Sequence, residues 1–174
     1  MRMSRTWAMP SADTFDIPQI QGFVKSYLTG ISIDPFARNS RIATYTNDLN
    51  PDTLAQHHMD VFDYLNMLLD KQIKADVIIF DPPYSPRQIK ECYDGIGLKM
   101  KSEDAWRSAG WMKERDIADR LLKIGGIVLS FGFNSCGMGK DRGYEIIEIL
   151  LVSHGATHND TICMAERKLQ GNLL

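Results

Sequence analysis

The sequence predicts an α/β fold in which helices cover both faces of a mostly parallel sheet. Strand-like and helix-like segments alternate along the chain, two strand-like segments are continuously apolar, and the last two form a hairpin. A length of 174 residues is close to that of one domain, so we expect a single domain over residues 1–174. Residues 1–15 are polar and irregular and are predicted to form an N-terminal arm.

In the first half of the chain, helix and strand signals follow one another up to a buried strand. Asp16 precedes a proline and an amphipathic pattern that stops at Gly30, which indicates a helix. The apolar run of residues 76–80 is typical of a strand buried on both faces. The expected elements are helices over residues 16–30 and 61–70, and strands over residues 31–33, 41–46 and 76–80.

The second half of the chain adds two helices, one strand and the hairpin. Ser85 and Pro86 have the cap-then-proline order of a helix start. A glycine-rich connection over residues 132–143 separates the last buried strand from the hairpin. The expected elements are helices from Ser85 and over residues 103–123, a strand over 127–131, and hairpin strands over 144–152 and 161–166.

Composition restricts the classes of protein to which the chain can belong. The formal net charge is −2, so any contact with a nucleic acid needs a local basic surface. The three cysteines form no CxxC pair, which argues against a disulfide framework and against a metal site. No apolar run approaches the length of about 18 residues that a membrane span needs, and no signal-peptide core is present, so we expect a cytoplasmic protein without membrane attachment.

Acidic side chains follow three of the predicted strands. Asp34, Asp48 and Asp81 each stand at the carboxyl end of such a strand. Ligands of open parallel sheets bind at this edge, so the three carboxylates are expected to converge on one crevice. A single acid in this position is more often a turn or cap residue, but three in succession favour a ligand site.

The most specific motif is Asp81-Pro82-Pro83-Tyr84, directly after the buried strand. Two consecutive prolines fix the backbone and remove two donors, which leaves the Pro82 carbonyl open beside the Asp81 carboxylate. Two adjacent acceptors can hold both hydrogens of an exocyclic amino group, and the Tyr84 ring can stack on a planar base with about 1–3 kcal/mol. The motif therefore predicts a site for a planar amine.

In this motif and in three others the chain resembles S-adenosylmethionine-dependent amino-methyltransferases, particularly the small orphan N6-adenine DNA methyltransferases of phages and mobile elements. The resemblance is carried by residues 32–38, 46–50, 58–60 and 81–84, in the family's order along the chain. It implies a Rossmann-like methyltransferase fold with a seven-stranded sheet, S-adenosylmethionine as cofactor and DNA as partner. The implied reaction transfers a methyl group to the exocyclic N6 amino group of adenine in DNA and needs no metal.

The resemblance also assigns roles to individual residues. Its cofactor-binding residues would be Asp34, Pro35, Phe36, Asp48 and Asp60, and its catalytic residues Asp81, Pro82, Pro83 and Tyr84. Among these, Asp48 would accept the ribose hydroxyls and Asp60 would lie near the adenine amino group of the cofactor. Where the family's first motif continues with glycines, this chain has Ala37-Arg38-Asn39. We expect a modified loop there, because Ala37 is small and Asn39 tolerates a left-handed conformation.

Other planar amines would fit the same loop, so several alternatives stay open. They are cytosine N4 in DNA, the amino group of an RNA base, and a glutamine amide in a protein. Aspartate at position 81 favours a nucleobase, since the related protein methyltransferases generally carry asparagine there. A non-catalytic cofactor-binding subunit of a methyltransferase complex is the alternative of a different class, and the intact Asp81-Pro82-Pro83-Tyr84 motif argues against it.

Contacts to DNA would come from a short basic region, because the chain has no inserted recognition region. The candidates for phosphate contacts are Arg87, Lys90, Lys99, Lys101, Lys140 and Arg142. Such mixed-charge segments more often form a solvated helix face. The brevity of the region favours a homodimer in which a second copy completes the substrate site.

Overall fold

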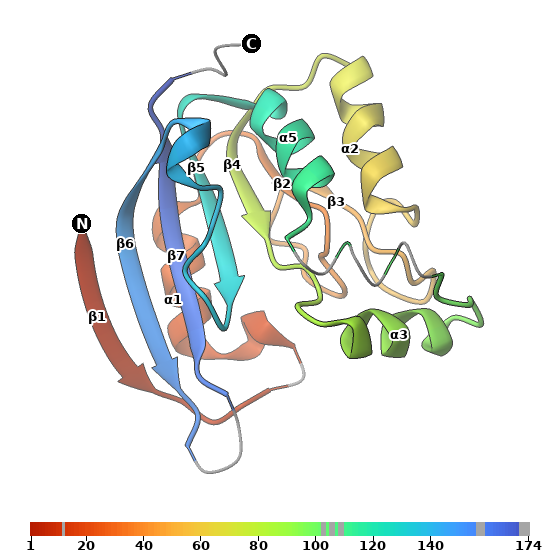
Figure 1. Cartoon of the computed structure of the whole chain (residues 1–174), viewed down its shortest axis with the longest axis horizontal. Coiled ribbons are helices and arrows are strands. Elements are labelled where there is room, and N and C mark those ends of the chain that lie inside the picture. The colour runs from red at the N-terminus through yellow and green to blue at the C-terminus, as the bar shows by residue number, and fades with distance from the viewer. Residues whose placement is uncertain (12, 102–103, 105–106, 108–109, 156–158, 171–174) are drawn as a thin grey trace.

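The computed structural model describes residues 1–11, 13–101, 104, 107, 110–155 and 159–170, with the backbone alone for Lys140 (Figure 1). One seven-stranded sheet has the order β1-β6-β7-β5-β4-β2-β3, and only β7 runs antiparallel to its neighbours. The strands are β1 Arg2–Trp7, β2 Ser32–Asp34, β3 Tyr45–Thr46, β4 Ala75–Phe80, β5 Leu122–Gly132, β6 Tyr144–Ser153 and β7 Thr161–Lys168. The helices are α1 Pro18–Tyr27, α2 Val61–Asp70, α3 Pro86–Gly95 and α5 Met112–Leu121, with short 3-10 turns η1 Thr14–Asp16 and η2 Lys140–Arg142. The predicted α/β fold, mostly parallel with a terminal hairpin, is confirmed.

Alternate residues of β4 point into two separate hydrophobic cores. Ile78 and Phe80 belong to the core that α2, α3 and α5 cover, whereas Val77 and Ile79 belong to the core that α1 covers. Burial of a side chain of this size contributes about 1.5–3 kcal/mol, so both faces of this strand stabilise the fold. Figure 1 shows α1 on the opposite face of the sheet from α2 and α5. Within the described ranges, no helix has the length and apolar character needed to cross a bilayer.

Local sequence signals explain where some of the helices begin. Pro86 stands in the first turn of α3, and the Ser85 hydroxyl accepts a hydrogen bond from the Gln88 amide at 3.2 Å, as the cap-then-proline pattern predicts. The start predicted for the first helix is displaced. Asp16 lies in the preceding turn η1, and α1 begins at Pro18 without a side-chain cap.

Three other predicted segments also differ in the structure. Residues 1–15 were expected to be irregular, but Arg2–Trp7 forms β1, which adds to the edge of β6 through main-chain pairing. The strand predicted over residues 41–46 is shortened to Tyr45–Thr46. In the segment 103–123, Met112–Leu121 is helical, but Leu122 already begins β5, since the glycines that predicted a helix stop lie inside this longer strand.

The parallel strands place the candidate site residues at one edge of the sheet. In the register of the sheet, Asp34 of β2 lies beside Thr46 of β3, and Ile33 lies beside Ile78 of β4. Asp81 directly follows β4, and Asp48 stands two residues after the end of β3. The crevice expected from three acid-ended strands is therefore built by neighbouring strands.

Candidate functional site

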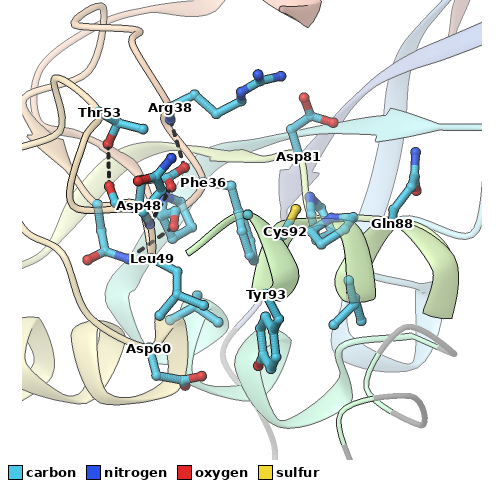
Figure 2. Close-up of a pocket in the computed structure, with 18 of the residues that line it drawn as sticks. Phe36, Arg38, Asp48, Leu49, Thr53, Asp60, Asp81, Gln88, Cys92 and Tyr93 are labelled. Atoms are coloured by element: carbon cyan, nitrogen blue, oxygen red, sulfur yellow. Dashed lines mark hydrogen bonds between the residues drawn. The ribbon is translucent and has the colours of Figure 1, made fainter. Parts of the chain in front are cut away.

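A cavity of about 590 Å³ opens at the carboxyl edge of β2, β3 and β4 (Figure 2). It brings together segments that are far apart in the sequence. Of the residues predicted for the site, the following line it: Pro35, Phe36, Asp48, Asp60, Asp81, Pro82, Pro83 and Tyr84. In the view of Figure 2, the Phe36 ring lies between Asp48 and Asp81. No group of three or more His, Cys, Asp or Glu side chains in the described part of the chain is arranged to hold a metal ion.

Asp34, the remaining residue predicted for the cofactor, is fully buried and does not line this cavity. Its Oδ1 accepts a hydrogen bond from the Phe36 amide at 3.2 Å, whereas its Oδ2 is buried and has no partner among the described residues. Burial raises the pKa of Asp34 well above its usual range, and the negative charges of Asp81 and Asp48 add to the rise. A buried oxygen without a donor could accept from a ligand N–H group, and a contact of Asp34 with the cofactor stays a prediction.

Backbone amides orient the Asp48 carboxylate. Its Oδ2 accepts from the Arg38 amide at 3.0 Å, and its Oδ1 accepts from the Asn50 amide at 2.8 Å. Each oxygen keeps a second lone pair, so the carboxylate can still accept two hydroxyl groups. These two acceptor oxygens fit the ribose diol that the resemblance assigns to Asp48.

The loop after β2 takes its turn at a residue other than the expected one. Arg38 has a left-handed φ of 48°, so the conformation expected of Asn39 is adopted by its neighbour. Ala37 is only 2% exposed, and its amide donates to the Asn47 carbonyl at 2.8 Å. A larger side chain at Ala37 would have no room in this packing, which agrees with the expectation of a small residue in a modified loop.

Asn47 is a residue whose importance the sequence pattern did not reveal. Its side-chain Nδ2 donates to the carbonyls of Pro35 at 3.3 Å and Met59 at 3.0 Å, and its Oδ1 accepts from the Met59 amide at 3.2 Å. These bonds connect the three segments assigned to the cofactor. An amide next to Asp48 was visible in the sequence, but its partners come from loops that only the fold brings together.

Asp60 is already engaged by protein groups. Its Oδ1 caps α2 by accepting from the Phe62 amide at 2.8 Å, and Arg107 donates to both of its oxygens at 2.8 and 3.0 Å. Although burial opposes it, the hydrogen bonds from Arg107 and Phe62 lower the pKa of Asp60. Arg107 also pairs with Glu114 at 2.7 Å and lies over the Trp111 ring. The contact of Asp60 with a cofactor adenine stays a prediction, and such a contact has to share this carboxylate with Arg107.

Two hydroxyl groups hold the Asp81 carboxylate. The Tyr84 hydroxyl donates to its Oδ1, and Thr14 of the N-terminal region forms a second hydrogen bond. Burial raises the pKa of Asp81, against these two hydrogen bonds and the positive charge of Arg38. In Figure 2 the Arg38 side chain extends toward Asp81.

The two proline carbonyls of the 81–84 loop differ. The Pro83 carbonyl accepts from Trp111 Nε1 at 3.1 Å. No donor among the described residues reaches the Pro82 carbonyl, so this oxygen is open for a ligand. The loop therefore combines one fixed carbonyl with one available acceptor next to Asp81.

A second cavity, of about 490 Å³, lies against the same loop. Pro82 and Tyr84 line both cavities, so the 81–84 loop is their common wall. Phe133, which is 57% exposed, lies edge-on to the Tyr84 ring with centroids 6.1 Å apart. A Cβ at Gly132 would come within 3.2 Å of the Tyr84 ring, so glycine allows this close approach. Phe133 was missed in the sequence, where its only signal was an aromatic residue following a buried strand.

The predicted phosphate-binding residues do not form one cluster. Arg87 pairs with Glu91 at 2.8 Å and Lys90 pairs with Asp94, both along α3, as on a solvated helix face. Lys99 and Lys101 are exposed, and the Lys140 side chain lies outside the described residues. Arg142 donates to Asp116 at 2.8 Å and to the Met138 carbonyl. Contacts of these residues with DNA stay predictions.

Comparison with known proteins connects this architecture to a class of folds. No family model matches the sequence, and no curated protein is similar to it in sequence. Among solved structures, SMU.776, assigned as a methyltransferase and crystallised with SAH, is 14% identical over 82% of this chain with a TM-score of 0.57. The N-methyltransferase NodS from Bradyrhizobium japonicum WM9 is 8% identical, with 87% of this chain and 92% of NodS covered and a TM-score of 0.55. TrmN from Thermus thermophilus is 15% identical over 86% of this chain, with a TM-score of 0.53.

The matches differ in how much of each relative they cover. The chain spans about half the length of SMU.776 and of TrmN, at 46% and 48%, but nearly all of NodS. Identities this low establish similarity of fold alone. The chain has the α/β fold of S-adenosylmethionine-dependent methyltransferases.

Proposed function

We propose that this protein transfers a methyl group from S-adenosylmethionine to the exocyclic N6 amino group of adenine in DNA. The observation that carries the proposal is the 81–84 loop, which separates two cavities and offers Asp81 and the open Pro82 carbonyl as adjacent acceptors. The first cavity contains Asp48, whose oxygens can accept hydrogen bonds from the cofactor. The second, beside the Tyr84 ring, takes the base.

The cofactor is held by groups from two loops. Asp48 accepts its ribose hydroxyls, and the unpartnered Oδ2 of Asp34 accepts from its amino group. Phe36 packs edge-on to Phe80 and Trp111, with centroids at 5.5 and 5.3 Å, and supports the wall of the cavity. When bound there, S-adenosylmethionine supplies an activated methyl group.

The loop positions the amino nitrogen. Asp81 and the Pro82 carbonyl accept its two hydrogens, which fixes the direction of the nitrogen lone pair. Because burial raises the pKa of Asp81, its carboxylate is a better acceptor for the proton that the methylated nitrogen releases. A base in a duplex has to leave the helical stack to reach this loop.

Identification of the product tests this proposal. The purified protein is incubated with isotopically labelled S-adenosylmethionine and, in separate reactions, unmodified DNA, RNA and protein. Each product is then digested and analysed by mass spectrometry. We expect labelled N6-methyladenine from DNA. Labelled N4-methylcytosine, a methylated RNA base or a methylated glutamine would instead establish one of the alternative substrates.

A variant pair tests whether the 81–84 loop carries the reaction. Asp81→Ala removes one acceptor and should abolish turnover, while calorimetry should show that binding of S-adenosylmethionine is retained. Asp94→Ala, an exposed carboxylate on α3, is the matched control and should leave turnover unchanged. Full activity of Asp81→Ala would contradict the proposed role of the loop.

A further inference from the structure

The second cavity contains an arginine that has no counter-ion among the described residues. Arg115 of α5 lines this cavity, and its side chain forms no hydrogen bond or ion pair with any described residue. Its Nε is buried and unpartnered, and its guanidinium lies 5.7 Å from the centroid of the Phe80 ring. A partly buried guanidinium that lacks hydrogen-bond acceptors is destabilising unless a ligand supplies them.

The charged groups around Arg115 do not satisfy it. Glu166 is an acid whose charge interacts with Arg115. Its Oε2 already accepts a hydrogen bond from the Met138 amide at 2.7 Å, and burial raises its pKa. Arg142 adds a second positive charge, which together with burial lowers the pKa of Arg115. No acidic side chain of the described residues lines the cavity itself. The local field in the cavity therefore favours an anion.

The other walls of the cavity fit a flat ring. Tyr84 and Phe133 provide aromatic surface, and Asn134 and Ser130 provide polar groups. A volume of about 490 Å³ lies within the range of small-molecule sites. An aromatic surface and an unpaired guanidinium in one cavity of this size match a nucleotide, in which a planar base and a phosphate are joined by a sugar.

We propose that Arg115 binds a phosphate of the nucleotide whose base is methylated. This inference rests on the proposed function and deepens it, because it assigns recognition of the acceptor nucleotide to a residue outside the 81–84 loop. The base lies against Tyr84 with its amino group toward Asp81, and the phosphate receives hydrogen bonds from the guanidinium. A glutamine side chain has no group that would occupy this position.

Binding of mononucleotides tests the assignment. The affinities of 2′-deoxyadenosine and of its 5′- and 3′-monophosphates are measured by calorimetry with S-adenosylhomocysteine present. The wild-type protein should bind at least one monophosphate about tenfold more tightly than the nucleoside, as expected for hydrogen bonds to a charged group. Arg115→Gln should lose this preference while keeping its affinity for the nucleoside. Arg115→Lys, which keeps the charge, should retain part of the preference.

A matched control distinguishes an effect of Arg115 in the cavity from a general effect of removing one positive charge. Arg120 lies on the same helix but is exposed, so Arg120→Gln should keep the full preference for the monophosphate. The assignment is overturned if Arg115→Gln keeps the preference, or if the wild-type protein shows none, including the case in which neither ligand binds. Should DNA adenine be methylated while either result is found, the proposed function stands and only the role of Arg115 fails. A product found only in protein would refute the proposed function itself.

Discussion

The Tyr84 hydroxyl has a role separate from that of its ring, because it affects the pKa of Asp81. It donates to Asp81, whose pKa is raised by burial and held down by this bond and by the one from Thr14. The proposed reaction needs the ionised carboxylate, so the hydroxyl extends the pH range over which Asp81 can act. The ring and the hydroxyl of Tyr84 therefore have separate physical roles.

Removing the Tyr84 hydroxyl should move the pH dependence of the reaction. In Tyr84→Phe the ring stays and the donor is lost, so the pKa of Asp81 rises and the acid limb of the kcat profile moves to higher pH. The loss of one such hydrogen bond, about 1 kcal/mol, corresponds to roughly a fivefold lower kcat on that limb. Tyr93→Phe, which removes another hydroxyl lining the same cavity, is the control and should leave the profile unchanged. Coincident profiles for Tyr84→Phe and wild type would contradict this role.

Asp34 illustrates how a buried carboxyl group lowers stability. Its folded pKa is raised by burial, so the folded state binds its proton more tightly than the unfolded state does. Stability is therefore lost as pH rises from the unfolded pKa toward the folded one, and it stays lower above both. The unpartnered Oδ2 is useful only when a ligand donates to it.

Asp34→Asn should raise stability and weaken cofactor binding together. At pH 8 the variant avoids the free-energy cost of burying the Asp34 carboxyl group, and a gain of about 1 kcal/mol would raise Tm by roughly 2–4 °C for a chain of this size. Thermal unfolding at pH 5 and pH 8 should show a smaller dependence on pH than in the wild type. Calorimetry with S-adenosylhomocysteine should show a weaker affinity. A Tm at pH 8 below that of the wild type would show that the carboxylate is not destabilising.

Whole elements were predictable where local chemistry determines them. Ser85 and Pro86 specify the start of α3, and the uninterrupted apolar run of β4 indicates burial on both faces. β1 could not be predicted, because most of its residues are exposed and its position depends on pairing with β6. The same limit applies to the site. Asp48 and the 81–84 motif could be identified from sequence, whereas Asn47 depends on contacts between separate loops.

Removal of β1 should expose an edge rather than disrupt the core. A variant lacking residues 1–7 loses the main-chain ladder and the contact of Arg2 with Glu148 at 2.5 Å, but almost no buried apolar surface. We expect a folded protein that self-associates through the open edge of β6. Sedimentation velocity over a concentration series measures this, with Ser4→Ala as a control that keeps the ladder. A truncated protein with the same association state as the full-length protein at all concentrations would argue against edge protection by β1.

The two ends of the sheet differ in the groups that they carry. The carboxyl edge of β4 bears the cavities, whereas a buried polar network closes the opposite end. There Lys168 Nζ lies 3.0 Å from Asp119 Oδ1 and donates to the Leu122 carbonyl at 3.2 Å, and the Tyr144 hydroxyl donates to Asp119 at 2.8 Å. This network joins α5, β5, β6 and β7 far from the candidate site.

Breaking this network should reduce stability without changing the chemistry. Lys168→Met leaves the Asp119 carboxylate buried and unpaired, which costs about 3–5 kcal/mol of the free energy of unfolding. Urea unfolding measures the loss, and Lys168→Met with Asp119→Asn should recover part of it because the uncompensated charge is gone. Activity per folded molecule at low temperature should equal that of the wild type. A large fall in kcat of the folded variant would show that the two ends are coupled.

The 81–84 loop forms the common wall of the two cavities. Pro82 and Tyr84 line both cavities, so ligands of the two cavities would share contacts with these residues. If one ligand changes the affinity for the second by some factor, thermodynamic linkage requires that the second ligand change the affinity for the first by the same factor. The pyrrolidine rings of Pro82 and Pro83 restrict the backbone of this loop, so the loop has little freedom to absorb a ligand-induced shift locally. Under the proposed function, binding of S-adenosylmethionine and binding of the acceptor base are therefore expected to affect each other through this short backbone segment.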